Sequence, residues 1–134
     1  MRSGENNMKT IRDILYHHRD NRDGINDFCA RLVERAKTCP RQTDIKSVSS
    51  SADIAVSTPN AAKAAYFAFS AADTLVAVRA AAVYEAHPEY DSENNPWPQA
   101  ARNDAHAAAD AERELQMEDL AEIFGVSPSA SPGT

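Results

Sequence analysis

The stretch from Ala61 to Ala86 constrains the fold more than any other part of this sequence. Twelve of its twenty-six residues are alanine, which has the highest intrinsic helix propensity of all residues. Pro59 precedes the stretch and Pro88 follows it, and proline is well tolerated only in the first turn of a helix. We therefore predict one continuous helix, capped by Thr58, ending near His87 and about 40 Å long at about 1.5 Å per residue.

This helix has a narrow polar strip, which predicts that other helices cover most of it. At about 100° per residue, one sector collects most of its polar side chains: Lys63, Ser70, Asp73, Thr74 and Glu85. Arg79 falls roughly opposite, where it needs either a carboxylate partner or a path to solvent. The predicted fold is all-α, a small helical bundle of four to five helices around a long alanine-rich central helix.

Apolar residues at helical spacing and turn residues between them predict the remaining helices. A helix of about three turns begins near Met8, a second covers about 25–38, and the last covers 98–124 with Gly125 as its C-cap. For 41–58 we predict one short helix followed by a loop, with an extended segment at 53–56 as the alternative. The domain division is then a flexible lead-in at 1–7, a single helical domain at 8–125, and a disordered tail at 126–134.

Composition favours a chain that works in the cytoplasm. Lys63, Asp73 and Arg79 interrupt the one stretch apolar enough to suggest a membrane span, and the first residues lack a secretory pattern. Cys29 and Cys39 fit no zinc spacing, so we expect two buried or half-buried thiols in a reducing compartment.

The charge is unevenly distributed along the chain. Residues 1–46 hold ten Lys and Arg against seven Asp and Glu, for +3, whereas residues 47–134 hold four against thirteen, for −9. This imbalance disfavours a nucleic-acid backbone as a direct partner and favours a protein target with a basic surface. A solvated acidic helix face, and pairing of the basic half with the acidic half inside the molecule, are the alternatives.

No pattern for catalysis, a cofactor or a metal is present in the sequence. The adjacent His17 and His18 point about 100° apart on a helix and do not bind one ion without other ligands. There is no G-x-S-x-G motif and no glycine-rich phosphate loop. We therefore expect a protein that is not an enzyme, with no catalytic, cofactor-binding or metal-binding residues.

Aromatic and acidic residues gather where the central helix ends and along the last helix. Exposed Tyr and Trp supply contact area, and surrounding carboxylates steer a basic partner toward them. The predicted partner-binding residues are Glu85, Glu89, Tyr90, Asp91, Glu93, Trp97, Asp104, Asp110, Glu114 and Glu118. The alternative for Trp97 is that it folds back and closes the core between the last two helices.

Several segments resemble one known family. The sequence from Ala109 to Leu120, followed by Ile123-Phe124-Gly125, is similar to the closing segment of alanine-rich putative immunity proteins of bacterial polymorphic-toxin systems and phages. Residues 29–35 look like their early helix, and Pro40-Arg41 resembles the start of their next helix, so the resemblance covers about 25–125. It implies a small inhibitor that binds and neutralises another protein.

Charge and resemblance together predict a toxin immunity protein or a phage anti-defence protein such as an anti-CRISPR. Its acidic surface would occlude a basic, nucleic-acid-binding site of the target. One alternative is a structural or regulatory homodimer that covers apolar surface of the 61–86 helix. Another is a DNA-binding regulator that uses the basic first two helices, among whose arginines five acidic residues are interleaved.

Overall fold

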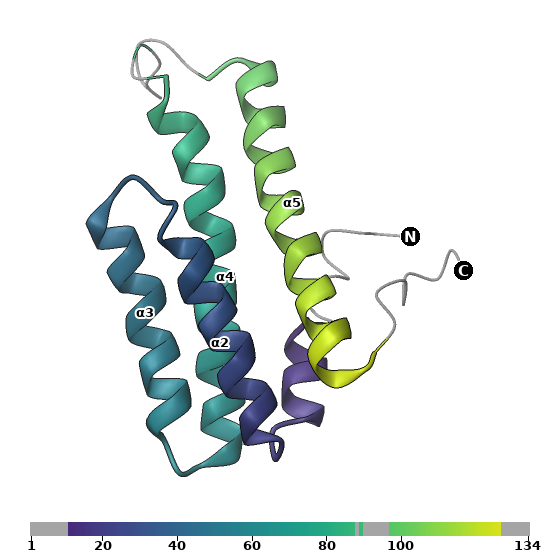
Figure 1. Cartoon of the computed structure of the whole chain (residues 1–134). Helices are drawn as coiled ribbons and strands as arrows, with labels where there is room; N and C mark the ends of the chain where they lie inside the picture. The colour runs from purple at the N-terminus through teal and green to yellow at the C-terminus, as the bar shows by residue number, and fades with distance from the viewer. Residues whose placement is uncertain (1–10, 88, 90–96, 127–134) are drawn as a thin grey trace.

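The computed structural model describes residues 11–87, 89 and 97–126. Every regular element in these ranges is helical: a helical segment at 11–17, α2 (Arg22–Ala36), α3 (Gln42–Ser57), α4 (Ala61–Glu85) and α5 (Gln99–Phe124). Figure 1 shows α2 to α5 running alternately up and down, with the 11–17 segment beside the lower ends of α4 and α5. The predicted all-α bundle is thereby confirmed, whereas the segments 1–7 and 127–134 lie outside the described residues.

The alanine-rich helix α4 is the central helix, as its sequence predicts. It packs against α2, α3 and α5, and its alanines let these helices approach closely. Its buried side chains are five alanines together with Leu75, Val76 and Val78. The upper ends of α4 and α5 extend beyond α2 and α3 in Figure 1. Val83 and Tyr84 are consequently only half-buried.

The cap of α4 differs from the prediction by two residues. Asn60, not Thr58, is the N-cap, and its Oδ1 accepts a hydrogen bond from the backbone N–H of Lys63 at 2.9 Å. Thr58 ends α3 instead, and its Oγ1 accepts a bond from the N–H of Asn60 at 3.2 Å. Asn is the stronger N-cap residue of the two, and only three residues separate the helices here.

The segment 41–58 corrects the prediction of a short helix followed by a loop. It forms one helix of 16 residues, with Val48, Ala52 and Ala55 buried against the neighbouring helices. The hydroxyl of Ser49 donates to the carbonyl of Ile45, four residues earlier, so this serine does not interrupt the helix. Packing of one apolar face therefore outweighs the weak helix propensity of the serines.

A glycine at the start of α2 allows close packing against the end of α5. We predicted that the second helix covers about 25–38, but it begins at Arg22, and Asn21 caps it by accepting a hydrogen bond from the N–H of Gly24 at 3.0 Å. A Cβ atom on Gly24 would lie 2.5 Å from the ring of Phe124. That ring also stacks on His18 at 4.7 Å between centroids, which joins α2, α5 and the N-terminal segment.

By length and composition alone, α4 is apolar enough to cross a membrane. The core helix of a soluble protein meets the same criterion, and about a third of the relevant window is buried inside this bundle.

Candidate partner-binding surface

Five charged residues form a partly buried ion cluster between α2, α4 and α5: Arg31, Arg35, Arg79, Glu112 and Asp119. Arg35 Nη2 lies 2.8 Å from Glu112 Oε2, and its Nη1 lies 2.8 Å from Asp119 Oδ2. Arg79 Nε approaches the other oxygen of Glu112 at 3.4 Å, and the Glu112 side chain is only 1 % exposed. The cluster joins α5 to both α2 and α4.

Hydrogen bonds complete the surroundings of the buried carboxylate. Gln116 Nε2 donates to Glu112 Oε2 and to the carbonyl of Ala72, both at 3.0 Å. Burial alone would lower the pKa of Arg35, but its hydrogen bonds and charge interactions with Glu112 and Asp119 outweigh that effect and raise the pKa. Arg79 has a carboxylate partner, Glu112, which is one of the two outcomes that the sequence left open. The ion pairs of Arg31 and Arg35 with carboxylates of α5 confirm pairing between the basic and acidic halves of the chain.

This cluster shifts the buried face of α5 relative to the prediction. The predicted apolar stripe included Ala108, Ala111 and Leu115, but Ala111 and Leu115 are exposed. The buried line follows instead Ala101, Ala105, Ala109, Glu112, Gln116, Met117, Asp119 and Leu120. Polar residues occupy positions on the buried face because arginines from two other helices meet them there, so apolar periodicity alone did not locate that face.

The predicted loop residues divide into paired, packed and undescribed ones. Glu85 forms an ion pair with Arg41, and Glu89 Oε2 lies 3.3 Å from His87 Nδ1. Trp97 is half-buried and meets the ring of Tyr84 edge-on, with the centroids 4.6 Å apart. Tyr90, Asp91 and Glu93 lie outside the described residues.

The predicted acidic residues of α5 differ in whether they form ion pairs. Asp110 pairs with Arg113 at 2.6 Å on the same helix. Asp104, Glu114 and Glu118 are exposed and form no ion pair with any residue in the described ranges. Leu115, next to Glu114 in sequence, is 41 % exposed. We call these four residues, Asp104, Glu114, Leu115 and Glu118, the acidic face of α5.

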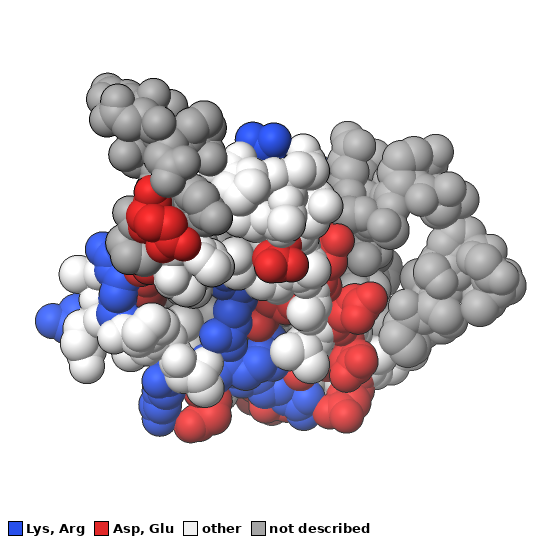
Figure 2. Space-filling model, turned by 90° about the horizontal axis from the view of Figure 1, so that it is seen from above, with Lys and Arg blue, Asp and Glu red and all other residues white. Residues whose placement is uncertain are grey.

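The acidic face lies at the outside of the bundle. In Figure 2, acidic atoms form a row along the side on which α5 lies in Figure 1, next to a group of basic atoms. Of the seven carboxylates on α5, Glu112 and Asp119 are buried in the ion cluster, and Glu122 pairs with Arg31 at 2.6 Å. The acidic surface of α5 is therefore smaller than the sequence suggested.

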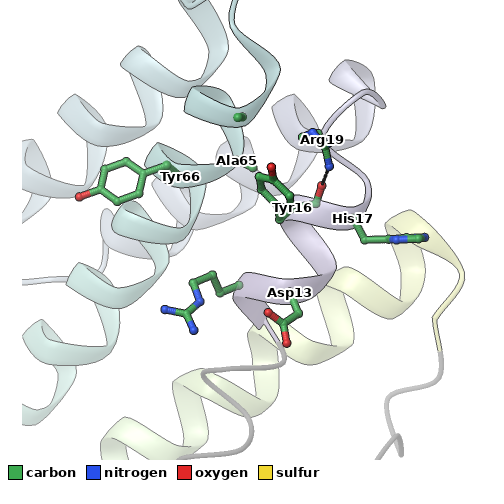
Figure 3. Close-up of a pocket in the computed structure, with 8 residues that line it drawn as sticks. Asp13, Tyr16, His17, Arg19, Ala65 and Tyr66 are labelled. Carbon is green, nitrogen blue, oxygen red and sulfur yellow. Dashed lines mark hydrogen bonds between the residues drawn. The ribbon is translucent and has the colours of Figure 1, made fainter.

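A groove of about 630 Å³ separates the 11–17 segment from the start of α4, and sequence reasoning did not find it. We call it the N-terminal groove, and Figure 3 shows the side chains that line it: Arg12, Asp13, Tyr16, His17, Arg19, Ala62, Ala65 and Tyr66. Tyr66 is 64 % and Tyr16 is 51 % exposed. Tyr66 is thus an uncovered aromatic on a helix that we expected to be largely enclosed.

The cysteines have the environment that their sequence context predicts. Cys29 and Cys39 are both buried and form no disulfide. Burial, together with the nearby Asp53 carboxylate, raises the pKa of the Cys29 thiol to about 12. Within the described ranges, no three His, Cys, Asp or Glu side chains are placed to hold a metal ion.

Comparisons with known protein families, with curated proteins and with solved structures find no match to this chain. The resemblance to immunity proteins therefore stays a prediction.

Proposed function

We propose that this protein is a small non-enzymatic inhibitor that binds another protein and blocks it. The target is a toxin or a defence nuclease complex with a basic, nucleic-acid-binding surface, as in toxin immunity or phage anti-CRISPR activity. The inhibitor acts in the cytoplasm, and its acidic face contacts the target protein rather than nucleic acid or a membrane.

The observation that carries this proposal is the set of unpaired carboxylates on the acidic face of α5. Glu114 and Glu118 are exposed and one helical turn apart, and they have no cation partner among the residues that the structure describes. Other exposed acids, such as Glu122 and Asp110, have arginine partners that neutralise them. The carboxylates without a partner supply the field that attracts a basic surface.

An exposed leucine gives this face a second means of contact. Leu115 is one of five large apolar side chains exposed in the described part of the chain, and it adjoins Glu114. An apolar side chain surrounded by charges resembles the arrangement of a binding interface, in which a desolvated centre has a polar rim. On the opposite side of α5 the ion cluster holds the helix against α2 and α4, so little ordering of the helix is needed on binding.

Charge reversal on the acidic face tests the proposal. The double variant Glu114→Lys/Glu118→Lys removes two negative charges and adds two positive ones on exposed positions, so the fold should be retained. Immobilised wild-type protein is used to capture partners from cell lysate, and mass spectrometry identifies them. The proposal predicts a nucleic-acid-binding protein that the double variant fails to capture and whose nucleic-acid binding the wild-type protein inhibits.

Asp73→Lys is the matched control because Asp73 is an exposed carboxylate on α4 and is not part of the acidic face of α5. This variant should capture the same partner as the wild type. Capture by the double variant at wild-type level would contradict the proposal, as would a captured partner whose nucleic-acid binding is unaffected.

A structural or regulatory homodimer is the second candidate function. It is favoured by the exposure of Tyr66 and Ala77 on the otherwise apolar α4. Light scattering coupled to size-exclusion chromatography distinguishes the two candidates, since a strict monomer at high protein concentration excludes the homodimer.

A further inference from the structure

The N-terminal groove concentrates the exposed aromatic surface of this protein. Tyr66 and Tyr16 have the highest exposed fractions of all large hydrophobic side chains in the described part of the chain, and both line this one groove. In Figure 3, Tyr66 comes from α4 with its ring directed away from the N-terminal segment, and Tyr16 comes from that segment beside Ala65. Exposed aromatic surface of this kind typically marks a binding site.

The groove also holds positive charge that internal pairing leaves available. Arginines on α2, α4 and α5 donate to carboxylates, to a glutamine or to backbone carbonyls, as Arg22 and Arg79 do. Arg12, by contrast, forms no hydrogen bond or ion pair with a described residue. Among the described residues, Arg19 donates only to the carbonyl of Tyr16, within its own segment, and its guanidinium lies 4.1 Å from the centre of the Tyr16 ring. Asp13 is the only carboxylate among the described lining residues, so the two guanidinium groups outnumber it.

We propose that the N-terminal groove binds a nucleotide, a ligand that joins an aromatic ring system to a phosphate. An exposed tyrosine ring can stack on a base, and guanidinium groups bind phosphate through paired hydrogen bonds. Ala62 and Ala65 also line the groove, and their small side chains leave room for a flat ring to approach the surface of α4. The groove volume of 630 Å³ lies within the range of sites for small ligands.

This site is separate from the acidic face of α5, and the proposal does not rest on the proposed inhibitor function. The ligand is either a free nucleotide or one nucleotide of a single strand, because both present the same base and phosphate. The Asp13 carboxylate accepts a hydrogen bond from an amino group of the base, and Arg12 and Arg19 bind the phosphate.

Calorimetric titration of the full chain tests the proposal with four probes. Adenosine monophosphate carries both parts of the ligand, adenosine only the ring system, inorganic phosphate only the anion, and hexadeoxyadenylate the strand. We expect adenosine monophosphate to bind with one-to-one stoichiometry and at least about tenfold more tightly than adenosine or phosphate, because it engages both halves of the groove. If hexadeoxyadenylate binds more tightly per nucleotide than adenosine monophosphate, the ligand is a nucleotide of a single strand. If it binds equally or more weakly, the ligand is a free nucleotide.

Two variants connect this binding to the groove. Tyr66→Ala and Arg12→Gln should each weaken the binding of adenosine monophosphate at least about fivefold, whereas Tyr66→Phe, which keeps the ring, should retain it. Leu115→Ala and Lys46→Gln are the matched controls, an exposed apolar residue and an exposed cation outside the groove, and should bind as the wild type does. Circular dichroism verifies that each variant is folded.

Three results would overturn the proposal. The first is binding of adenosine monophosphate no tighter than that of phosphate alone. The second is unchanged binding by Tyr66→Ala and Arg12→Gln. The third is a dimer in light scattering that Tyr66→Ala dissociates and adenosine monophosphate does not, because a second copy of the chain would then occupy the groove.

Discussion

Removing the charge of Glu112 should destabilise the bundle by about 2–3 kcal/mol, although Glu112→Gln preserves the size and shape of the side chain. The carboxylate is 1 % exposed and is shared by Arg35, Arg79 and Gln116. Hydrogen bonds between charged groups each contribute about 1.5–3 kcal/mol, but bonds that share one carboxylate are not additive. Asp119 still binds Arg35 at 2.8 Å, and the two arginine side chains are 21 % and 26 % exposed, so water compensates for part of the loss.

Urea unfolding followed by far-ultraviolet circular dichroism measures this effect. For a slope of about 1–3 kcal/mol per molar urea, the expected loss lowers the midpoint by roughly 0.7–3 M with the slope unchanged. Glu118→Gln is the matched control, since the same substitution on an exposed, unpaired carboxylate should change the free energy of unfolding by less than about 0.5 kcal/mol. Equal midpoints for the two variants would falsify the ion cluster as a source of stability.

Three further predictions address packing and ionisation. Leu120→Ala should lower the free energy of unfolding, measured with urea, by about 2–5 kcal/mol, because Leu120 is fully buried. Leu115→Ala should lower it by less than about 0.5 kcal/mol, because Leu115 is exposed. The reverse order would mean that α5 is rotated about its axis. Gly24→Ala should lower the free energy of unfolding by about 1–3 kcal/mol, because the added methyl group would lie 2.5 Å from the Phe124 ring. Adding Phe124→Leu to this variant should recover part of the loss. A thermal melting temperature unchanged by Gly24→Ala would contradict this contact. The unfolded Cys29 thiol ionises above pH 9.0 while the native thiol keeps its proton to about pH 12, so the free energy of unfolding should fall with rising pH in this window, by up to about 1.4 kcal/mol per pH unit. Cys29→Ala should lose this part of the pH dependence in urea unfolding, and an identical dependence in both proteins would argue against a buried thiol.

Local sequence signals predicted the helical fold well because they act over only a few residues. The run of alanines between two prolines identified α4 almost to the residue, and Gly125 ends α5 in the left-handed conformation with φ of 75°. The same kind of reasoning was wrong for 41–58, where the serines suggested a loop. The hydroxyls of Ser47 and Ser49 donate to backbone carbonyls within the helix, and the burial of Val48 and Ala55 supplies the stability that propensity does not.

The candidate sites depended on contacts that join distant parts of the chain. Sequence reasoning identified α5 as acidic, but it did not distinguish Glu112, which is buried against two arginines, from Glu114 and Glu118, which are exposed. The need of Arg79 for a partner was the one signal that pointed toward Glu112. Nothing in the periodicity of the first helix indicated that Tyr16 would share a groove with Tyr66, fifty residues later.

By itself the sequence determined that the fold is all-helical, that the alanine-rich helix is central, and that the two halves of the chain carry opposite net charge. Only the tertiary structure decided which charges face each other and which face solvent. The physical reason is that helix propensity and capping are properties of neighbouring residues, whereas the pairing of Arg35 with Glu112 depends on how two helices are rotated about their axes. A rotation by one residue, about 100°, exchanges a buried carboxylate for an exposed one. It would thereby move the acidic face to a different side of the molecule.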